Sequence, residues 1–197
     1  MTTLDASLIR AVSVRDHFSA ALDAAARNQD VRLKDGTAVY IVNLLTEFCA
    51  TSALGAVTDA ERHIKPLALI YGEALDAPTV EQRRRILQRL GDLALFISGI
   101  FSDSLGRRNV DVDYYIGMGE AAYGYVHDSL RQGPRTGFAG EIFAELGRKF
   151  SALVDLLGEI SEMSGLKSNS DMLRTYELWQ KTGSARALRQ LRRAGIV

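Results

Sequence analysis

The fold class is decided by residues 79–101, which read TVEQRRRILQRLGDLALFISGIF. Thr79 has a side chain that commonly caps helix N-termini, and apolar residues then recur every three or four positions. The seam they form consists of Ile86, Leu90, Leu93, Ile97 and Ile100. From Leu93 onward the stretch is apolar on nearly every side, which is typical of a helix surrounded by others. We therefore predict a long central helix over about residues 80–106.

Helical spacing continues on both sides of this central stretch, and only three prolines interrupt it. Ser13, with Asp16 three places on, predicts the start of the first helix, so that residues 1–12 form a flexible or short helical arm. Further helices are predicted after the turn at 34–36, from Pro66 to residue 74, from 111 to 131, from 138 to 164, from 168 to 182 and within 184–197. The sequence thus predicts an all-α, single-domain bundle of about seven or eight helices spanning residues 1–197.

The composition excludes several functional classes. Lysine plus arginine equal aspartate plus glutamate at 24 each, so no global charge attracts nucleic acid or an anionic membrane. The most apolar run, Leu93 to Phe101, is far shorter than the roughly 20 residues of a transmembrane helix. The first 30 residues contain four aspartates and do not resemble a secretory signal. The single cysteine, Cys49, reads as a reduced, buried thiol. We expect a cytoplasmic protein.

A cluster of polar and aromatic side chains in the predicted helix 111–131 could line a ligand pocket against the helix that contains residues 91–106. The candidate ligand-binding residues are Tyr114, Tyr115, Glu120, Tyr123 and His127. Because buried tyrosine hydroxyls need hydrogen-bond partners, a structural network explains these residues equally well.

No catalytic or metal-binding constellation is recognisable. The pair Asp111 and Asp113 could bind a hard cation, but carboxylates at a helix start more often cap free N–H groups. The three histidines lie on separate predicted elements without metal-ligand spacing. We therefore predict no catalytic residues, no metal and no cofactor.

Small residues form two stripes at helical spacing. One consists of Gly117, Ala121 and Gly124, and the other of Gly91, Ala94, Ser98 and Ser102. Glycine inside a helix costs roughly 1 kcal/mol relative to alanine, so tight helix packing should compensate. We expect Gly117 and Gly124 to lie at close helix contacts.

The C-terminal residues 184–197 form a basic amphipathic pattern. Four arginines on one side could contact phosphate, an acidic partner or a membrane surface: Arg186, Arg189, Arg192 and Arg193. Leu188 and Leu191 occupy the other side. A solvated helix that docks its leucines on the core is the favoured alternative, and nucleic-acid binding is possible but not favoured. We also expect a homodimer formed through the first and last helices.

The segments Gly91 to Leu105 and Val110 to Gly119 resemble parts of an uncharacterised family of bacterial cytosolic helical proteins, and residues 176–183 give the same impression. This resemblance covers about a third of the chain. It implies a bacterial, cytosolic origin and no activity, cofactor or site residue.

Three functional hypotheses follow. The leading one is a non-enzymatic regulatory or adaptor protein that binds a protein partner through a helical surface. The second is a small-molecule-binding protein or enzyme with a pocket between the helices near 91–106 and 111–130. The third is a nucleic-acid-associated regulator that uses the arginine-rich C-terminal helix. A closed, well-packed contact between the two helices near 91–106 and 111–130 would favour the adaptor, whereas a cavity with converging polar groups would favour the ligand.

Overall fold

The computed structural model describes residues 3–53, 66–100, 112–131 and 137–163, with backbone only for 3–13 and 49–53. These residues form seven helices and no strand, which confirms the predicted all-α bundle. The helices are α1 (Thr3–Asn28), α2 (Asp35–Ala53), α3 (Leu67–Leu75), α4 (Val80–Ile100), α6 (Val112–Arg131), α7 (Phe138–Arg148) and α8 (Phe150–Met163).

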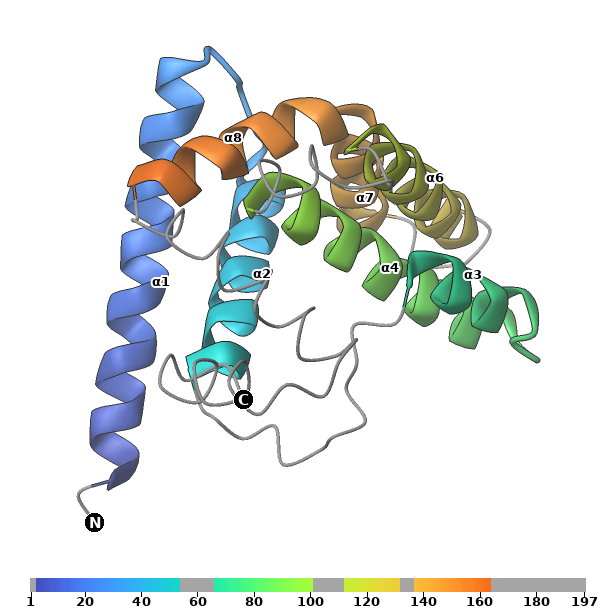
Figure 1. The fold of residues 1–197 in the computed structure, drawn as a ribbon, viewed down its shortest axis with the longest axis horizontal. Coiled ribbons are helices and arrows are strands. Elements are labelled where there is room, and N and C mark those ends of the chain that lie inside the picture. The colour runs from blue at the N-terminus through green and yellow to red at the C-terminus, as the bar shows by residue number, and fades with distance from the viewer. Residues whose placement is uncertain (1–2, 54–65, 101–111, 132–136, 164–197) are drawn as a thin grey trace, which may run out of the picture.

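Helix α4 lies at the centre of the bundle, as its sequence predicts (Figure 1). It contacts α3, α6 and α8 along its length. Its side chains also reach α2, where the rings of Phe96 and Phe48 stack with centroids 4.2 Å apart. The predicted cap is confirmed as well, because the Gln82 N–H donates to the Thr79 hydroxyl over 3.2 Å.

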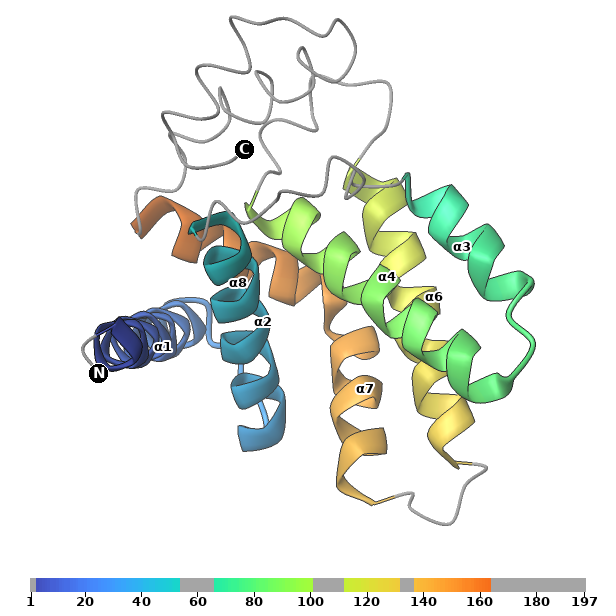
Figure 2. The same cartoon turned by 90° about the horizontal axis from the view of Figure 1, so that it is seen from below.

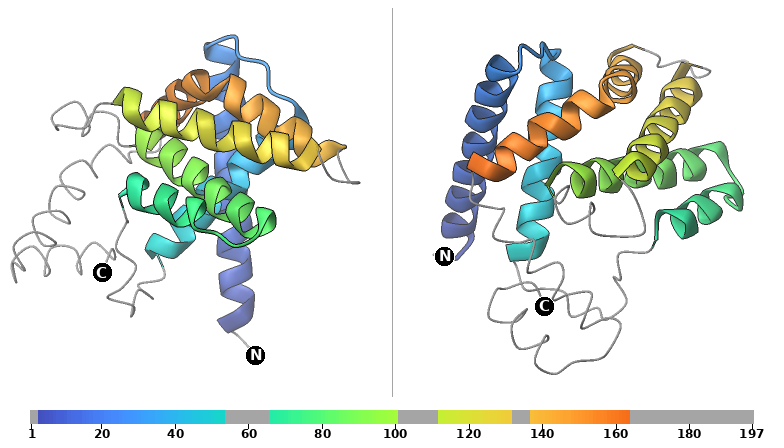
Figure 3. Two further views of the ribbon diagram at one scale, coloured as in Figure 1. Left: turned by 90° about the vertical axis from the view of Figure 1, so that its right-hand side faces the viewer. Right: turned by 45° about the horizontal axis from the view of Figure 1, so that its top comes forward.

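The remaining helices form two groups around α4. Helices α1 and α2 form an antiparallel pair, and α8 crosses this pair while it also contacts α4 (Figures 1 and 2). Helices α6 and α7 form the second group, and α3 packs on α4 at the far side of the molecule from α1 (Figure 3). One continuous core results, since the buried apolar residues of all these helices belong to a single cluster.

Two predicted helix boundaries are wrong. Helix α1 begins at Thr3, so Ser13 lies inside the helix and does not start it. The predicted helix 138–164 is two helices that break at Lys149 and run in different directions (Figure 2). The break lets α7 pack on α6 while α8 turns to cover α1 and α4. The apolar spacing continues across Lys149, which explains why the sequence predicts one helix.

The glycine prediction is correct for α4, wrong for Gly117 and correct in part for Gly124, whose backbone N would lie 3.7 Å from a Cβ on Gly147 of α7. Gly91 and Gly99 of α4 are buried, and a Cβ on Gly91 would lie 2.6 Å from the Tyr123 ring. A Cβ on Gly117 or Gly124 would meet nothing within 4 Å. The close approach on α6 is made instead by Gly119, whose added Cβ would overlap the buried ring of Phe150. Ser102 lies outside the described residues.

Candidate functional site

A largely buried carboxylate joins three helices at the centre of the bundle. Asp92 of α4 accepts hydrogen bonds on the same oxygen, Oδ1, from two tyrosine hydroxyls. Tyr40 of α2 donates over 2.6 Å and Tyr123 of α6 over 2.7 Å. Gln88, one turn before Asp92, donates from its amide to the Tyr40 hydroxyl over 3.1 Å. These four side chains are here called the Asp92 cluster.

Burial controls the protonation of the Asp92 cluster. Loss of hydration raises the pKa of Asp92 to about 6, although the two tyrosine hydrogen bonds partly oppose the shift. Burial also raises the pKa of Tyr123, and the neighbouring carboxylate adds to this effect. Tyr123 is fully buried, with its ring against Gly91 and between Phe143 and Phe150. Asp92 Oδ1 and the hydroxyls of Tyr40 and Tyr123 thus bind one another, with Tyr123 fully buried and the other two side chains partly buried.

The pKa of Asp92 predicts a stability that falls as the pH rises. Because its folded pKa lies above the ordinary value of 3.8, the folded state binds the proton more tightly than the unfolded state between pH 4 and 6. Asp92 thus contributes most below about pH 4 and loses that contribution as the pH rises through about 6. We expect its contribution to the free energy of unfolding to drop by about 1 kcal/mol between about pH 5 and pH 7.

Urea denaturation across this pH range, with wild type compared to two variants, measures the effect. Asp92→Asn should remove the drop, whereas replacement of the exposed Asp155 by asparagine should keep it. The lowered pKa values of Glu141, Glu145 and Glu159 act with the opposite sign, and only below about pH 4.5. An equal slope in wild type and Asp92→Asn would show that Asp92 does not titrate in this window.

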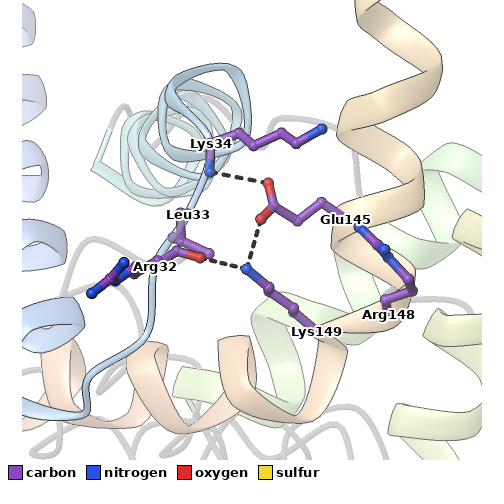
Figure 4. Close-up of a pocket in the computed structure, with 6 residues that line it drawn as sticks. All are labelled: Arg32, Leu33, Lys34, Glu145, Arg148 and Lys149. Atoms are coloured by element: carbon purple, nitrogen blue, oxygen red, sulfur yellow. Dashed lines mark hydrogen bonds and ion pairs between the residues drawn. The ribbon is translucent and has the colours of Figure 1, made fainter.

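An open groove between the α1–α2 connection and α7 holds a second buried carboxylate (Figure 4). Glu145 has only 3% of its side chain exposed. It accepts hydrogen bonds from the Thr37 hydroxyl over 2.6 Å and from the Lys34 backbone N–H over 3.1 Å, and it pairs with the Lys149 ammonium over 2.8 Å. Burial raises the pKa of Glu145, but these partners outweigh burial and the net pKa is lowered.

The cations of this groove are engaged in holding the fold together. Lys149 also donates to the backbone carbonyl of Arg32, and Lys34 pairs with Glu141 over 2.8 Å. Arg148 donates to the carbonyl of Ala144 over 3.2 Å, and the side chain of Arg32 extends away from Glu145 in Figure 4. Because these groups converge on the Glu145 carboxylate and the Arg32 carbonyl, the contacts fasten the α1–α2 connection to α7.

The five residues predicted to bind a ligand do not converge in the structure. Tyr123 lies buried against Asp92, whereas Glu120, about one turn earlier on α6, is exposed. The rings of Tyr114 and Tyr115 meet edge to face, with centroids 5.6 Å apart. Nδ1 of His127 lies 2.8 Å from the carbonyl oxygen of Gly140 on α7. Ligand binding by these residues stays a prediction, and the contacts shown are those of helix packing.

The structure describes only some of the other candidate residues from the sequence. Asp113 lies in the first turn of α6, where a carboxylate meets the positive end of the helix dipole. Asp111 and the arginines of residues 184–197 lie outside the described residues, as does the side chain of Cys49. Among the described residues, no three His, Cys, Asp or Glu side chains gather in a way that could hold a metal ion. None of the described helices is long and apolar enough to span a membrane.

A surface that the sequence analysis did not identify lies on α3 and the first residue of α4. Four of the eight large apolar side chains that are exposed in the described part of the chain belong to this segment, with 43–59% exposure: Leu69, Tyr71, Leu75 and Val80. We call this set the α3 surface. Tyr71 and Leu75 share one side of α3, whereas Leu69 lies on a different side. The sequence LALIYGEAL is apolar around the whole helix, a pattern typical of buried helices. The inward face of α3 buries Leu67, Ile70 and Ala74, and its principal contact is with α4 alone.

The α3 surface is held rigidly in place. Arg83 of α4 donates from Nε to the carbonyl of Ala74 over 2.9 Å and from its terminal guanidinium nitrogen to that of Leu75 over 3.1 Å. These bonds tie α4 to the C-terminal end of α3, where the Ala74 carbonyl also accepts from the Ala77 N–H. Ala68, Tyr71 and Leu75 follow at helical spacing along one side of α3 and are all exposed. An exposed apolar strip on a fixed helix is a feature of protein-binding surfaces.

Comparison with known proteins adds no assignment, because the chain matches no family model, no curated protein and no solved structure.

Proposed function

We propose that the protein is a non-enzymatic regulatory or adaptor protein, acting in the cytoplasm, that binds a protein partner through the α3 surface. The observation that carries this proposal is the exposure of Leu69, Tyr71, Leu75 and Val80 on a helix whose sequence is typical of a buried one. Burying such side chains against a partner is favourable by about 1.5–3 kcal/mol for each large residue that becomes fully covered.

The contact between α4 and α6 supports this function over a small-molecule pocket. From the sequence, a ligand pocket was one hypothesis for this contact. In the structure the ring of Tyr123 packs there against Gly91. The polar groups there are Asp92, Tyr40 and Tyr123, and they bind one another. A closed contact of this kind favours a protein that acts through its surface.

The chemistry of α3 indicates what kind of partner it binds. Residues 67–85 contain three acidic residues, Glu73, Asp76 and Glu81, and three basic ones, Arg83, Arg84 and Arg85, so their charges balance. An exposed apolar strip on a helix suits the apolar face of an amphipathic helix. We therefore propose an amphipathic helix of another protein as the partner segment.

Site-specific photocrosslinking in the native cell tests this function. A photoreactive phenylalanine analogue at Leu75 should crosslink to a partner protein, whereas the same analogue at the exposed Ser151 of α8 should not. A synthetic peptide of the crosslinked segment should then bind the purified protein at least tenfold more weakly when Leu75 is replaced by aspartate. Equal crosslinking at both positions, or crosslinks only to a second copy of this chain, would overturn the adaptor role.

A further inference from the structure

The joint between α7 and α8 consists of a single residue, Lys149. Helical backbone hydrogen bonds are made on both sides of it. The Lys149 N–H donates to the Glu145 carbonyl over 2.9 Å, and the Leu153 N–H donates to the Lys149 carbonyl over 2.8 Å. Lys149 itself has φ −106° and ψ 17°, whereas an α-helix has about −63° and −42°. A change in the backbone angles at this one joint would therefore make α7 and α8 a single helix.

The apolar pattern of the sequence also runs through the joint. Four fully buried residues follow one another at intervals of four, three and four positions: Leu146, Phe150, Leu153 and Leu157. This is the spacing of one side of a continuous helix. In such a helix Phe150 stays one turn after Leu146 on the same face. The sequence of residues 138–163 thus fits a straight helix as well as the bent pair.

A straight helix would remove α8 from the core of its own copy. Figure 2 shows that α8 turns away from the direction of α7, and it packs on α1 and α4. This packing keeps four large residues of α8 fully buried: Leu153, Leu156, Leu157 and Ile160. A monomer with a straight helix would expose them to water, which is unfavourable. A second copy can cover them again, because its α1 and α4 offer the same surface once its own α8 has left.

We propose that the α7–α8 joint is a hinge and that two copies of this chain exchange α8 through it. In the exchanged dimer, residues 138–163 of each copy form one helix, and each α8 packs on α1 and α4 of the other copy. The contacts of α8 with these helices are recovered, and only the joint differs from the monomer. Such an exchange is a low-cost route to a twofold dimer. The inference concerns α7 and α8, so it does not rest on the function proposed for the α3 surface.

Ser151, the second residue of α8, distinguishes the bent joint from the straight helix. In the bent form its N–H lies in the first turn of α8 and has no acceptor within that helix, so proline is tolerated there. In the straight helix the same N–H would donate to the Gly147 carbonyl, and proline would remove this bond and clash with the preceding turn. Alanine at this exposed position suits a helix interior better than serine does.

Analytical ultracentrifugation tests the hinge after concentrated protein has been held at the midpoint of urea unfolding and returned to buffer. The wild type and Ser151→Ala should yield a dimer, whereas Ser151→Pro should dimerise at least tenfold more weakly. Circular dichroism melting checks that Ser151→Pro is folded. A wild type and Ser151→Ala that both remain monomeric, or a folded Ser151→Pro that dimerises like the wild type, would overturn the inference.

Crosslinking between α1 and α8 shows whether the dimer has exchanged α8, whatever the fold of Ser151→Pro. The Asn28 amide donates to the Glu159 carboxylate over 2.6 Å, so these positions lie together. One chain would carry Asn28→Cys and another Glu159→Cys, each with Cys49→Ser, and a short bismaleimide would be added to their mixture. Chains mixed in urea and refolded should crosslink to each other, whereas chains mixed without urea should not. A dimer without this crosslink would show that α8 stays in its own copy.

Discussion

Replacement of Gly119 by leucine is expected to lower the free energy of unfolding by about 3 kcal/mol or more. A side chain at this position would occupy the space of the Phe150 ring, and Phe150 is fully buried at the junction of α7 and α8. Neither the ring nor the backbone of α6 can move without disturbing the α4–α6 and α6–α7 contacts. Overpacking of a close-packed core costs typically 1–3 kcal/mol, and the overlap here is at the severe end.

Replacement of Gly117, two residues away, is the matched control. A Cβ at Gly117 meets nothing within 4 Å, and the position is exposed. Leucine is a better helix former than glycine, so Gly117→Leu should leave stability unchanged or raise it by about 0.5 kcal/mol. Urea denaturation of both variants measures the difference. Similar losses in the two variants would contradict the assignment of Gly119 as the point of close approach.

The second large effect is expected at Glu145. Truncation to alanine leaves the Thr37 hydroxyl and the Lys34 N–H without their acceptor, and it removes the carboxylate that pairs with Lys149. Removing one partner of such a buried network should cost about 2–4 kcal/mol at neutral pH. Because the pKa of Glu145 is lowered, its contribution is present above about pH 4.5 and is lost as the pH falls below its folded pKa.

Glu141, one turn earlier on α7, provides the control for Glu145. It pairs with the side chain of Lys34, but 64% of its own side chain is exposed. Exposed ion pairs contribute little, so Glu141→Ala should melt close to the wild type. Thermal melts at about pH 7 and about pH 3 compare both variants with the wild type. A Glu145→Ala protein that melts like wild type at neutral pH would show that the groove does not fasten the α1–α2 connection.

Apolar periodicity was sufficient to predict the helices and the central position of α4. From Leu93 onward α4 is apolar nearly all round, a pattern typical of a helix that is buried on several sides. The break at Lys149 could not be predicted, because Phe150, Leu153 and Leu157 continue the spacing of the preceding helix. The break follows from tertiary packing, since α7 and α8 cover different neighbours.

The contacts of individual side chains were harder to predict than the helices. Gly117, Ala121 and Gly124 have the spacing of a packing stripe, yet the inward face of α6 is marked by the larger residues Ala122, Tyr123 and Val126. Asp92 stands in a largely apolar stretch, which signals a buried carboxylate, but its partners lie 52 and 31 residues away in sequence. The exposure of the α3 surface could not be predicted. The stretch between Pro66 and Pro78 is largely apolar, and such a sequence is expected both for a helix covered by its own protein and for one covered by a partner.

The most direct measurement of the central claim is crosslinking from the α3 surface in the native cell. A photoreactive phenylalanine analogue would be placed at Leu75 of α3 and, for comparison, at the comparably exposed Val39 of α2. We predict a crosslink to a partner protein from Leu75 and none from Val39. No crosslink from Leu75 to another protein, or equal crosslinking from both positions, would contradict the assignment of the α3 surface as a docking site.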